Sequence, residues 1–322
     1  MIMQGGKARN MKEYKKENKM RDNVGGLSFI IPAYNEEDGI GDTLKRLEKT
    51  LSQTGIQYEI ILVNDGSEDK TLEIAGRFKN VNIINHPVNI GYGNAIKTCL
   101  RSAKYEWIGI TDADGTYPVE DLPLFISEMR KGFDMVIGSR DNIGTADNIT
   151  KKISRWIFKK IIKVTVKKDI VDPNSGLRLF KKNMAMSLYP FLCGSFSFTT
   201  TLTILASGMS LFIKYVPIKY SKRYGSSKVN YVKDSFRTMQ YIVQGITFFN
   251  PIKFFIILSI CMVIFICIPA MIFALFRMLT LSLYYMIFGA TGIMLIGLGV
   301  LGDIIRISSG QKRSSVNDEI LI

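Results

Sequence analysis

Residues 107–115 read Trp-Ile-Gly-Ile-Thr-Asp-Ala-Asp-Gly, an apolar run that ends in two aspartates one residue apart. The apolar part is typical of a buried strand. In an extended segment alternate side chains point the same way, so Asp112 and Asp114 converge at the end of that strand. Two carboxylates in this arrangement can hold a hard cation together with substrate phosphates and water. The stretch predicts a site for Mg²⁺ or Mn²⁺, where the cation would neutralise charge on a departing diphosphate.

Five short apolar runs, separated by polar and helix-like segments, lie between residues 27 and 140. The runs are Leu27–Pro32, Tyr58–Val63, Val81–Ile84, Trp107–Ile110 and Met135–Ile137. The segments with helical character are Asp42–Leu51, Lys70–Phe78 and Ala95–Ala103. Another strand or two is expected within Met209–Ile218. This alternation predicts an α/β fold with a Rossmann-like, mostly parallel sheet covered by helices.

Polar motifs follow four of the five runs, at residues 33–37, 64–67, 112–115 and 138–140. Parallel strands end at one edge of a sheet, and ligands bind beyond that edge, so the four motifs predict a single site. Asp65 lies in the second motif, Asn-Asp-Gly-Ser, which on its own can be a purely structural turn. Because Asp65 is expected at the same edge of the sheet as the aspartate pair, a role in ligand binding is favoured.

Several other kinds of site are disfavoured. Residues 89–93 read Asn-Ile-Gly-Tyr-Gly, but Ile96 stands where a nicotinamide-binding fingerprint needs its third glycine. We interpret this stretch as a glycine-rich entry to a helix that begins near Asn94. His86 is the only histidine, and we expect a loop residue after the third strand rather than a catalytic base. None of the four cysteines forms a CxxC pair, so neither a zinc site nor a disulfide framework is indicated.

Two long uncharged runs lie near the carboxyl terminus. They span Phe254–Phe276 and Met278–Gly302, and Arg277 stands alone between them. Each exceeds the ~20 residues that a helix needs to cross a bilayer core. The alternative is a pair of buried core helices, which rarely run so long without a polar face. We expect a transmembrane hairpin whose two ends lie on the same side of the membrane.

The net charge of +14 lies almost entirely in the first 250 residues. Basic flanks favour the cytoplasmic side of a membrane and attract anionic lipid headgroups. Nucleic acid is the other common partner of a basic domain, but no nucleic-acid motif is present, and we expect none to bind. Residues 141–170 mix basic and apolar side chains, which suits either a helix at the membrane surface or one packed on the sheet.

These patterns predict five regions. They are a disordered basic tail (1–26), a catalytic domain (27–230), an amphipathic interfacial helix (231–251), two transmembrane helices (252–304) and a tail (305–322). We expect a multi-pass membrane protein with the catalytic domain and both termini in the cytoplasm. The sequence leaves open whether the chain forms a homo-oligomer.

The motifs at residues 29–37, 63–67, 89–95 and 112–114 resemble, in order and spacing, those of the family 2 glycosyltransferases with a GT-A fold. Residues 138–140, 175–178 and 223–228 are similar to the polyprenyl-phosphate branch, which includes dolichol-phosphate mannosyltransferases and undecaprenyl-phosphate glucosyltransferases. Two membrane helices near the carboxyl terminus match that branch as well.

The resemblance implies roles by position. For the base, ribose and phosphates of a nucleotide-sugar it implies Pro32, Ala33, Tyr34, Glu36, Val63, Asp65, Ala113, Arg223 and Lys228. For the metal and the catalytic centre it implies Asp112, Asp114 and Arg140. For the acceptor phosphate it implies Arg140, Arg155, Ser175 and Arg178. Thr116 stands where the branch usually has a glutamine that completes the metal shell, and Cys99 stands where a glycine is usual.

The implied reaction is transfer of a hexose from a nucleotide-sugar to a polyprenyl phosphate, with inversion. The lipid phosphate has a second pKa of about 6, so the nucleophile is already anionic at neutral pH and needs no strong general base. The version of the second motif found here is more like that of UDP-sugar users, with a GDP-mannose user as the alternative. One rival function is a processive polysaccharide synthase, whose QxxRW elongation motif residues 154–156 (Ser-Arg-Trp) match only in part. The other rival is an inactive membrane scaffold.

Overall fold

The computed structural model describes residues 25–141, 170–221 and 251–320. The strands are β1 (Leu27–Ala33), β2 (Tyr58–Asp65), β3 (Val81–His86), β4 (Trp107–Ile110), β5 (Met135–Arg140), β6 (Arg178–Lys181) and β7 (Ile213–Ile218). The helices of this domain are α2 (Ile40–Gln53), α3 (Thr71–Ala75), α4 (Tyr92–Ser102), α5 (Leu122–Arg130), α7 (Lys182–Ser187) and α8 (Phe198–Gly208). All five predicted strands and the three predicted helices are confirmed, and one strand, β7, lies in the predicted stretch 209–218.

The seven strands form one sheet in the order β3-β2-β1-β4-β6-β5-β7. Strands β1 to β4 are parallel, and β5 is parallel to β7. Strand β6 is antiparallel to both of its neighbours, β4 and β5. The chain winds outward from β1 to β3 and then returns to the other side of β1 as β4. A crevice opens beyond the strand ends at such a reversal, and it is the usual ligand site of these folds.

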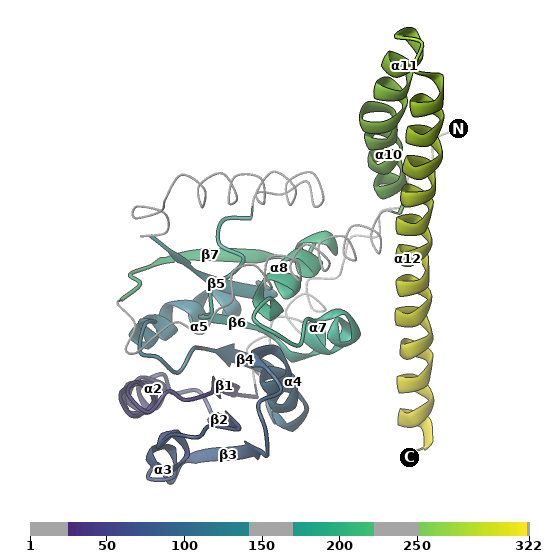
Figure 1. The fold of residues 1–322 in the computed structure, drawn as a ribbon. Helices are drawn as coiled ribbons and strands as arrows, with labels where there is room; N and C mark the ends of the chain where they lie inside the picture. The colour runs from purple at the N-terminus through teal and green to yellow at the C-terminus, as the bar shows by residue number, and fades with distance from the viewer. Residues whose placement is uncertain (1–24, 142–169, 222–250, 321–322) are drawn as a thin grey trace, which may run out of the picture.

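Helices cover both faces of the sheet (Figure 1). Helices α2, α3 and α5 pack on one face with the side chains of Phe29 and Leu62, and α4, α7 and α8 pack on the other with those of Ile30 and Val63. Successive residues of β1 and β2 thus point to opposite faces, and both sets are apolar, as expected for strands buried on both sides. The polar motifs predicted to form the site lie at the ends of the parallel strands β1, β2 and β4.

Strand β6 was not predicted from the sequence. It has four residues, and only the pairing with its neighbours identifies it as a strand. Arg178, its first residue, pairs with Ile110 at the end of β4 and with Ile137 in β5. Because β6 runs against them, its beginning lies at the edge where β4 and β5 end. The residues just before Arg178 are thereby brought beside the aspartate pair.

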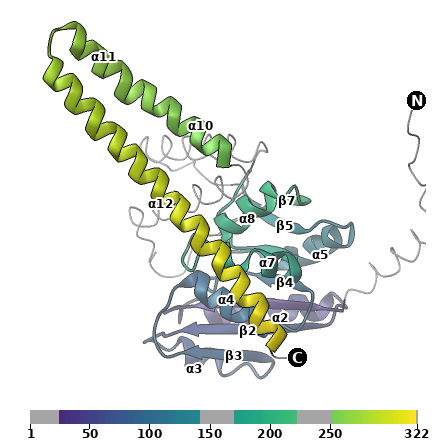
Figure 2. The same ribbon diagram turned by 90° about the vertical axis from the view of Figure 1, so that its right-hand side faces the viewer.

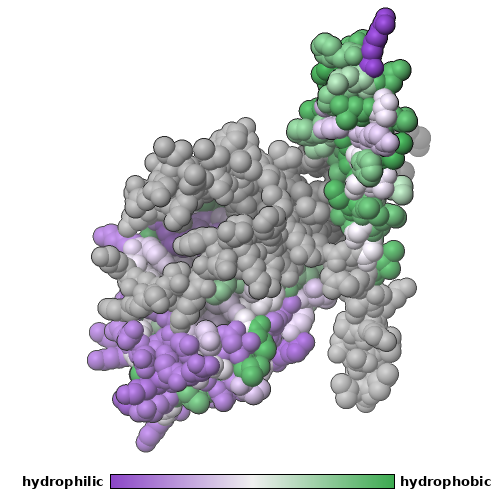
Figure 3. All heavy atoms as spheres, viewed as in Figure 1, coloured by the Kyte–Doolittle hydropathy of each residue, from purple (hydrophilic) through white to green (hydrophobic). Residues whose placement is uncertain are grey.

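The carboxyl-terminal part is a helical hairpin. It consists of α10 (Pro251–Met262), the π-helix η3 (Val263–Cys267), α11 (Ile268–Leu275) and α12 (Leu279–Ile320). Two segments, Leu258–Leu275 and Leu279–Gly302, are long and apolar enough to cross a membrane. Only 6% of each is buried within the described structure, which disfavours the alternative of buried core helices. Figure 3 shows the apolar surface that they present.

Helix α12 continues beyond its apolar part. It runs without a break from Leu279 to Ile320, so the predicted boundary at residue 304 does not coincide with a helix end. Past the apolar segment it lies beside the catalytic domain, in contact with the short helix η2 (Tyr189–Phe191) (Figure 2). The predicted interfacial helix at 231–251 falls almost wholly outside the described residues, as do the predicted tail 1–26 and the basic stretch 141–170.

Candidate active site

The aspartate pair follows β4 at the switch point, and a hydroxyl group holds each carboxylate. The Tyr92 hydroxyl, at the start of α4, donates to Asp112 Oδ1 at 2.9 Å. The Thr116 hydroxyl and backbone amide both donate to Asp114 Oδ1, at 2.6 and 3.2 Å. Burial raises the pKa of Tyr92 well above its usual value, and the charge of Asp112 raises it further. Tyr92 is therefore protonated at neutral pH and remains a donor to Asp112.

The donor set fits a divalent cation that completes its shell with substrate and water. The described residues hold no group of three or more His, Cys, Asp or Glu side chains suited to a metal, so within them the carboxylate pair is the candidate for metal binding. Magnesium is commonly bound by one or two carboxylates plus substrate phosphates. Gly176 lies directly against Asp112, since a Cβ there would be 2.8 Å from both carboxylate oxygens. The backbone thus leaves room for this carboxylate only because residue 176 is glycine.

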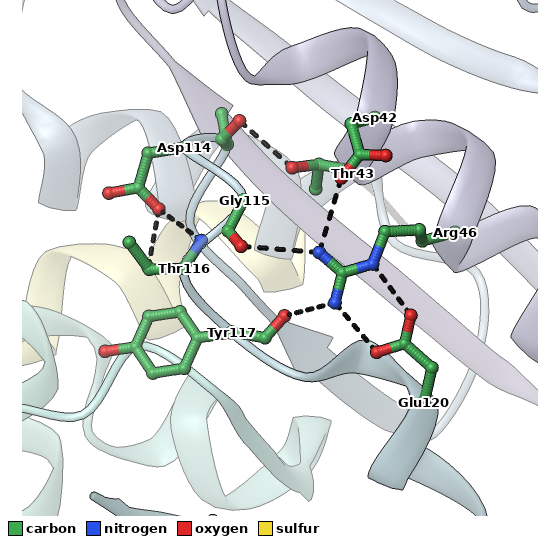
Figure 4. Close-up of polar contacts among 9 residues, drawn as sticks. Asp42, Thr43, Arg46, Asp114, Gly115, Thr116, Tyr117 and Glu120 are labelled. Carbon is green, nitrogen blue, oxygen red and sulfur yellow. Dashed lines mark hydrogen bonds and ion pairs between the residues drawn. The ribbon is translucent and has the colours of Figure 1, made fainter. Parts of the chain in front are cut away.

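Helix α2 holds the loop that carries Asp114 from the outside (Figure 4). Arg46 binds both carboxylate oxygens of Glu120, at 2.7 and 2.8 Å. The same guanidinium donates to the backbone oxygens of Gly115 and Tyr117, at 3.3 and 3.2 Å. One turn earlier, the Thr43 hydroxyl donates to Ala113 O at 3.1 Å. Side-chain donors of α2 therefore fix the backbone on both sides of Asp114.

Asp65, at the end of β2, is buried and bonded to the protein. Its oxygens accept from the amides of Ile90 and Gly91 at 3.1 and 2.9 Å, and Oδ1 lies 2.8 Å from His86 Nδ1. His86 is the last residue of β3, not a loop residue as expected, and its other nitrogen lies 3.1 Å from the Thr98 hydroxyl. Asp65 thus orders the glycine-rich entry to α4, which begins at Tyr92, two residues earlier than predicted.

Hydrogen bonds connect the end of β1 with the loop after β2. Asn35 adopts a positive φ of 50°, which asparagine tolerates better than most residues. The backbone amide of Asn35 donates to the Ser67 hydroxyl at 2.9 Å, and its side-chain oxygen accepts from Glu68 N at 2.8 Å. Glu36 N donates to the Thr71 hydroxyl at 2.8 Å. Tyr34 and Glu36 are partly exposed at this edge, whereas Pro32, Ala33 and Val63 are buried in the ends of their strands.

Arg140, the last residue of β5, pairs with Asp172. Its Nε and Nη2 donate to the two oxygens of that carboxylate at 2.8 and 2.9 Å. Its guanidinium also lies over the Tyr220 ring, 5.2 Å from the centroid. Burial alone would lower the pKa of Arg140, but the bond to Asp172 and the nearby charges outweigh it and raise the pKa. Arg140 is therefore a fixed cation. The charges of Asp112 and Asp114 contribute to raising the pKa of the same Tyr220, so Arg140 lies near the aspartate pair.

Ser175 and Arg178 lie inside the domain. Ser175 is fully buried, and its hydroxyl has no hydrogen-bond partner among the described residues. The Arg178 guanidinium is also fully buried and donates to the backbone oxygens of Pro173, Ser175 and Thr199 and to the Thr203 hydroxyl. Burial lowers the pKa of Arg178. The described contacts of this arginine are thus with the segment around Ser175 and with α8.

The structure brings most of the predicted site residues to one edge, and three fall outside the described residues: Arg155, Arg223 and Lys228. Sequence reasoning missed the parts played by Tyr92, Arg46 and Asp172. Tyr92 lies within the glycine-rich motif at residues 89–93, and a hydroxyl group in that motif could have indicated a hydrogen bond to the site. Arg46 and Asp172 carry no motif signal, because only the fold brings them to the site.

Comparison with known proteins agrees with this geometry. A mostly parallel sheet with a carboxylate pair at its switch point is typical of ligand-binding α/β folds. Residues 28–188 match the sequence profile of glycosyl transferase family 2. The chain belongs to this family, and its fold is the GT-A fold of glycosyltransferases.

Curated relatives and a solved structure extend the comparison. The chain is 28% identical over 222 residues to the low-salt glycan biosynthesis hexosyltransferase Agl6 of Haloferax volcanii (67% of this chain, 53% of that protein). It is 31% identical over 185 residues to the dolichyl-phosphate β-glucosyltransferase ALG5D of Trichomonas vaginalis (51% of this chain, 55% of that protein). The matches thus span little more than half of either relative.

A similar solved structure is glucosyl-3-phosphoglycerate synthase from Mycobacterium tuberculosis, crystallised with Mn²⁺, UDP-glucose and phosphoglyceric acid. Its TM-score is 0.58 at 14% identity, and the alignment covers 76% of this chain and 86% of that one. At this identity the likeness bears on the fold alone.

Proposed function

We propose that this protein transfers a hexose from a UDP-sugar to a polyprenyl phosphate, with inversion and with dependence on Mg²⁺ or Mn²⁺. The observation that carries the proposal is the pair Asp112 and Asp114 at the end of β4, each held by a hydroxyl group, in a family 2 chain with two apolar helices. The named activities of Agl6 and ALG5D support a hexose donor, and that of ALG5D a lipid-phosphate acceptor.

The reaction needs little from the protein beyond position and charge. An oxygen of the lipid phosphate attacks the anomeric carbon, the bond to the nucleoside diphosphate breaks, and the diphosphate departs with its electron pair. A bound divalent cation would neutralise the charge that develops on this leaving group. Tyr92 and Thr116 hold the carboxylates that would bind the cation. Arg140, fixed by Asp172, supplies positive charge for a phosphate of donor or acceptor.

The membrane anchor gives the lipid a route to the site. We infer that the two apolar helices cross the bilayer as a hairpin and that its basic flanks keep the catalytic domain and both termini on the cytoplasmic side. A polyprenyl phosphate with its headgroup at the cytoplasmic surface then lies on the same side as the soluble nucleotide-sugar. The reaction brings the two substrates together without moving either across the bilayer.

The test is a turnover assay with the detergent-purified protein, a polyprenyl phosphate, Mg²⁺ or Mn²⁺, and a panel of UDP- and GDP-sugars. We expect release of a nucleoside diphosphate with one UDP-sugar, dependent on both lipid and metal and absent in Asp114→Asn. One sugar per lipid in the product would exclude a processive synthase. Release with GDP-mannose alone would overturn the donor assignment, and release without lipid would overturn the acceptor.

A further inference from the structure

Thr116 lies two residues after Asp114, where the resemblance leads one to expect a glutamine ligand of the metal. It is fully buried, and its hydroxyl donates to Asp114 Oδ1 at 2.6 Å, a short distance typical of a bond to a charged acceptor. Its own amide donates to the same oxygen at 3.2 Å. Two donors from one residue therefore meet a single oxygen of this carboxylate (Figure 4).

Hydrogen bonds to other parts of the protein hold the backbone around Thr116. Its carbonyl accepts from the amide of Ser221 at 3.0 Å, which connects it to the segment after β7. The carbonyls of its neighbours Gly115 and Tyr117 both accept from Arg46. The backbone on either side of Thr116 is thus bonded to the protein, and the side chain is enclosed. The fold itself therefore places this hydroxyl against the Asp114 carboxylate.

We propose that Thr116 is a positioning residue: its buried hydroxyl fixes the orientation of the Asp114 carboxylate and so sets the affinity of the site for its divalent cation. The inference rests on the proposed function. A carboxylate that is already oriented loses little conformational entropy when it binds a cation. Because this entropy is not lost on binding, the cation is bound more tightly. Thr116 therefore acts on the cation through the orientation of Asp114 rather than as a ligand of the cation itself.

The test compares Thr116→Val, which removes the hydroxyl at nearly constant size, with Thr116→Ser, which retains it. The measurement is Mn²⁺ binding to the full chain in detergent with UDP present, by calorimetry. We expect the Val variant to raise the Kd for Mn²⁺ about tenfold and the Ser variant to stay within about twofold of the wild type. Thr201→Val is the matched control, because its buried hydroxyl bonds to the backbone of Ser197, Phe198 and Cys193.

Each outcome bears on the proposal. An unchanged Mn²⁺ affinity in a folded Thr116→Val protein overturns it, as does an equal loss in Thr201→Val. Should the Val variant fail to fold, Thr116→Ala against Thr116→Ser makes the same comparison without added bulk. If the wild type binds no Mn²⁺ with UDP or with GDP, the proposed function itself fails, and that result does not depend on Thr116.

Discussion

Replacing the buried Arg178 with methionine separates two roles for this residue. Sequence resemblance implies contact with the acceptor phosphate, whereas the guanidinium donates to three backbone carbonyls and one hydroxyl inside the domain. Methionine fills much of the same volume with no donor. Thr199 O keeps a partner, because the Thr203 hydroxyl donates to it at 2.8 Å. The loss falls mainly on the carbonyls of Pro173 and Ser175.

The magnitude follows from those two carbonyls. Leaving a buried polar group without a partner costs about 1–3 kcal/mol, so two cost about 2–6 kcal/mol. Part of this is offset because a buried guanidinium is itself poorly solvated, as its lowered pKa indicates. A net loss of about 2–4 kcal/mol corresponds to a fall in Tm of roughly 4–16 °C for a domain of this size. We expect Arg178→Met to lose activity through this instability.

The assay is thermal unfolding of the purified protein followed by tryptophan fluorescence. Trp107 is buried in β4 opposite Lys181 of β6, so its emission reports on the strand that Arg178 begins. Arg77→Met is the control, since Arg77 makes an exposed ion pair with Glu73 and should change Tm by about 2 °C or less. If Arg178→Met melts like this control and yet has no turnover, the structural role is refuted, and the contact with acceptor phosphate is favoured.

Three further changes test the carboxylate pair and its supports. Tyr92→Phe removes the donor to Asp112 and should lower kcat/KM about tenfold with little change in Tm; wild-type kinetics would show that the hydroxyl does not matter. Gly176→Ala places a Cβ 2.8 Å from both Asp112 oxygens and should lower kcat about a hundredfold, whereas Gly25→Ala, with open space around it, should have no effect; equal activity in the two would contradict this packing. Arg46→Met should lower Tm by about 2–4 °C and weaken Mn²⁺ binding, because the loop loses its contacts with α2; a drop in Tm with unchanged Mn²⁺ affinity would limit Arg46 to a structural role.

Much of the fold followed from local patterns. The strands that begin at Leu27 and Tyr58 are apolar on both faces and end in polar motifs, so their position in a covered parallel sheet was readable from sequence. Strand β6 was not, because its four residues form a strand only through pairing with β4 and β5. Non-local pairing of this kind leaves no periodic signal in so short a stretch.

The candidate site divides in the same way. Asp112 and Asp114 were predicted because strand alternation alone places them together. The contacts of Tyr92 and Arg46 with that loop were not, since each joins residues far apart in the chain. Burial also changes what a residue type implies: Arg178, expected near a phosphate, makes its described hydrogen bonds within the protein.

The antiparallel strand also affects how the domain can be made. Among the described strands β5 pairs with β6 and β7 alone, and both follow it in the chain. While the ribosome adds residues 141–181, at about 5–20 residues per second, β5 has no partner strand and β4 has an open edge for several seconds. Exposed edges are where strands of different molecules join, so aggregation during synthesis is expected to begin here. A shortened chain intended to fold on its own therefore has to extend through Ile218, well beyond residue 188, where the family match ends.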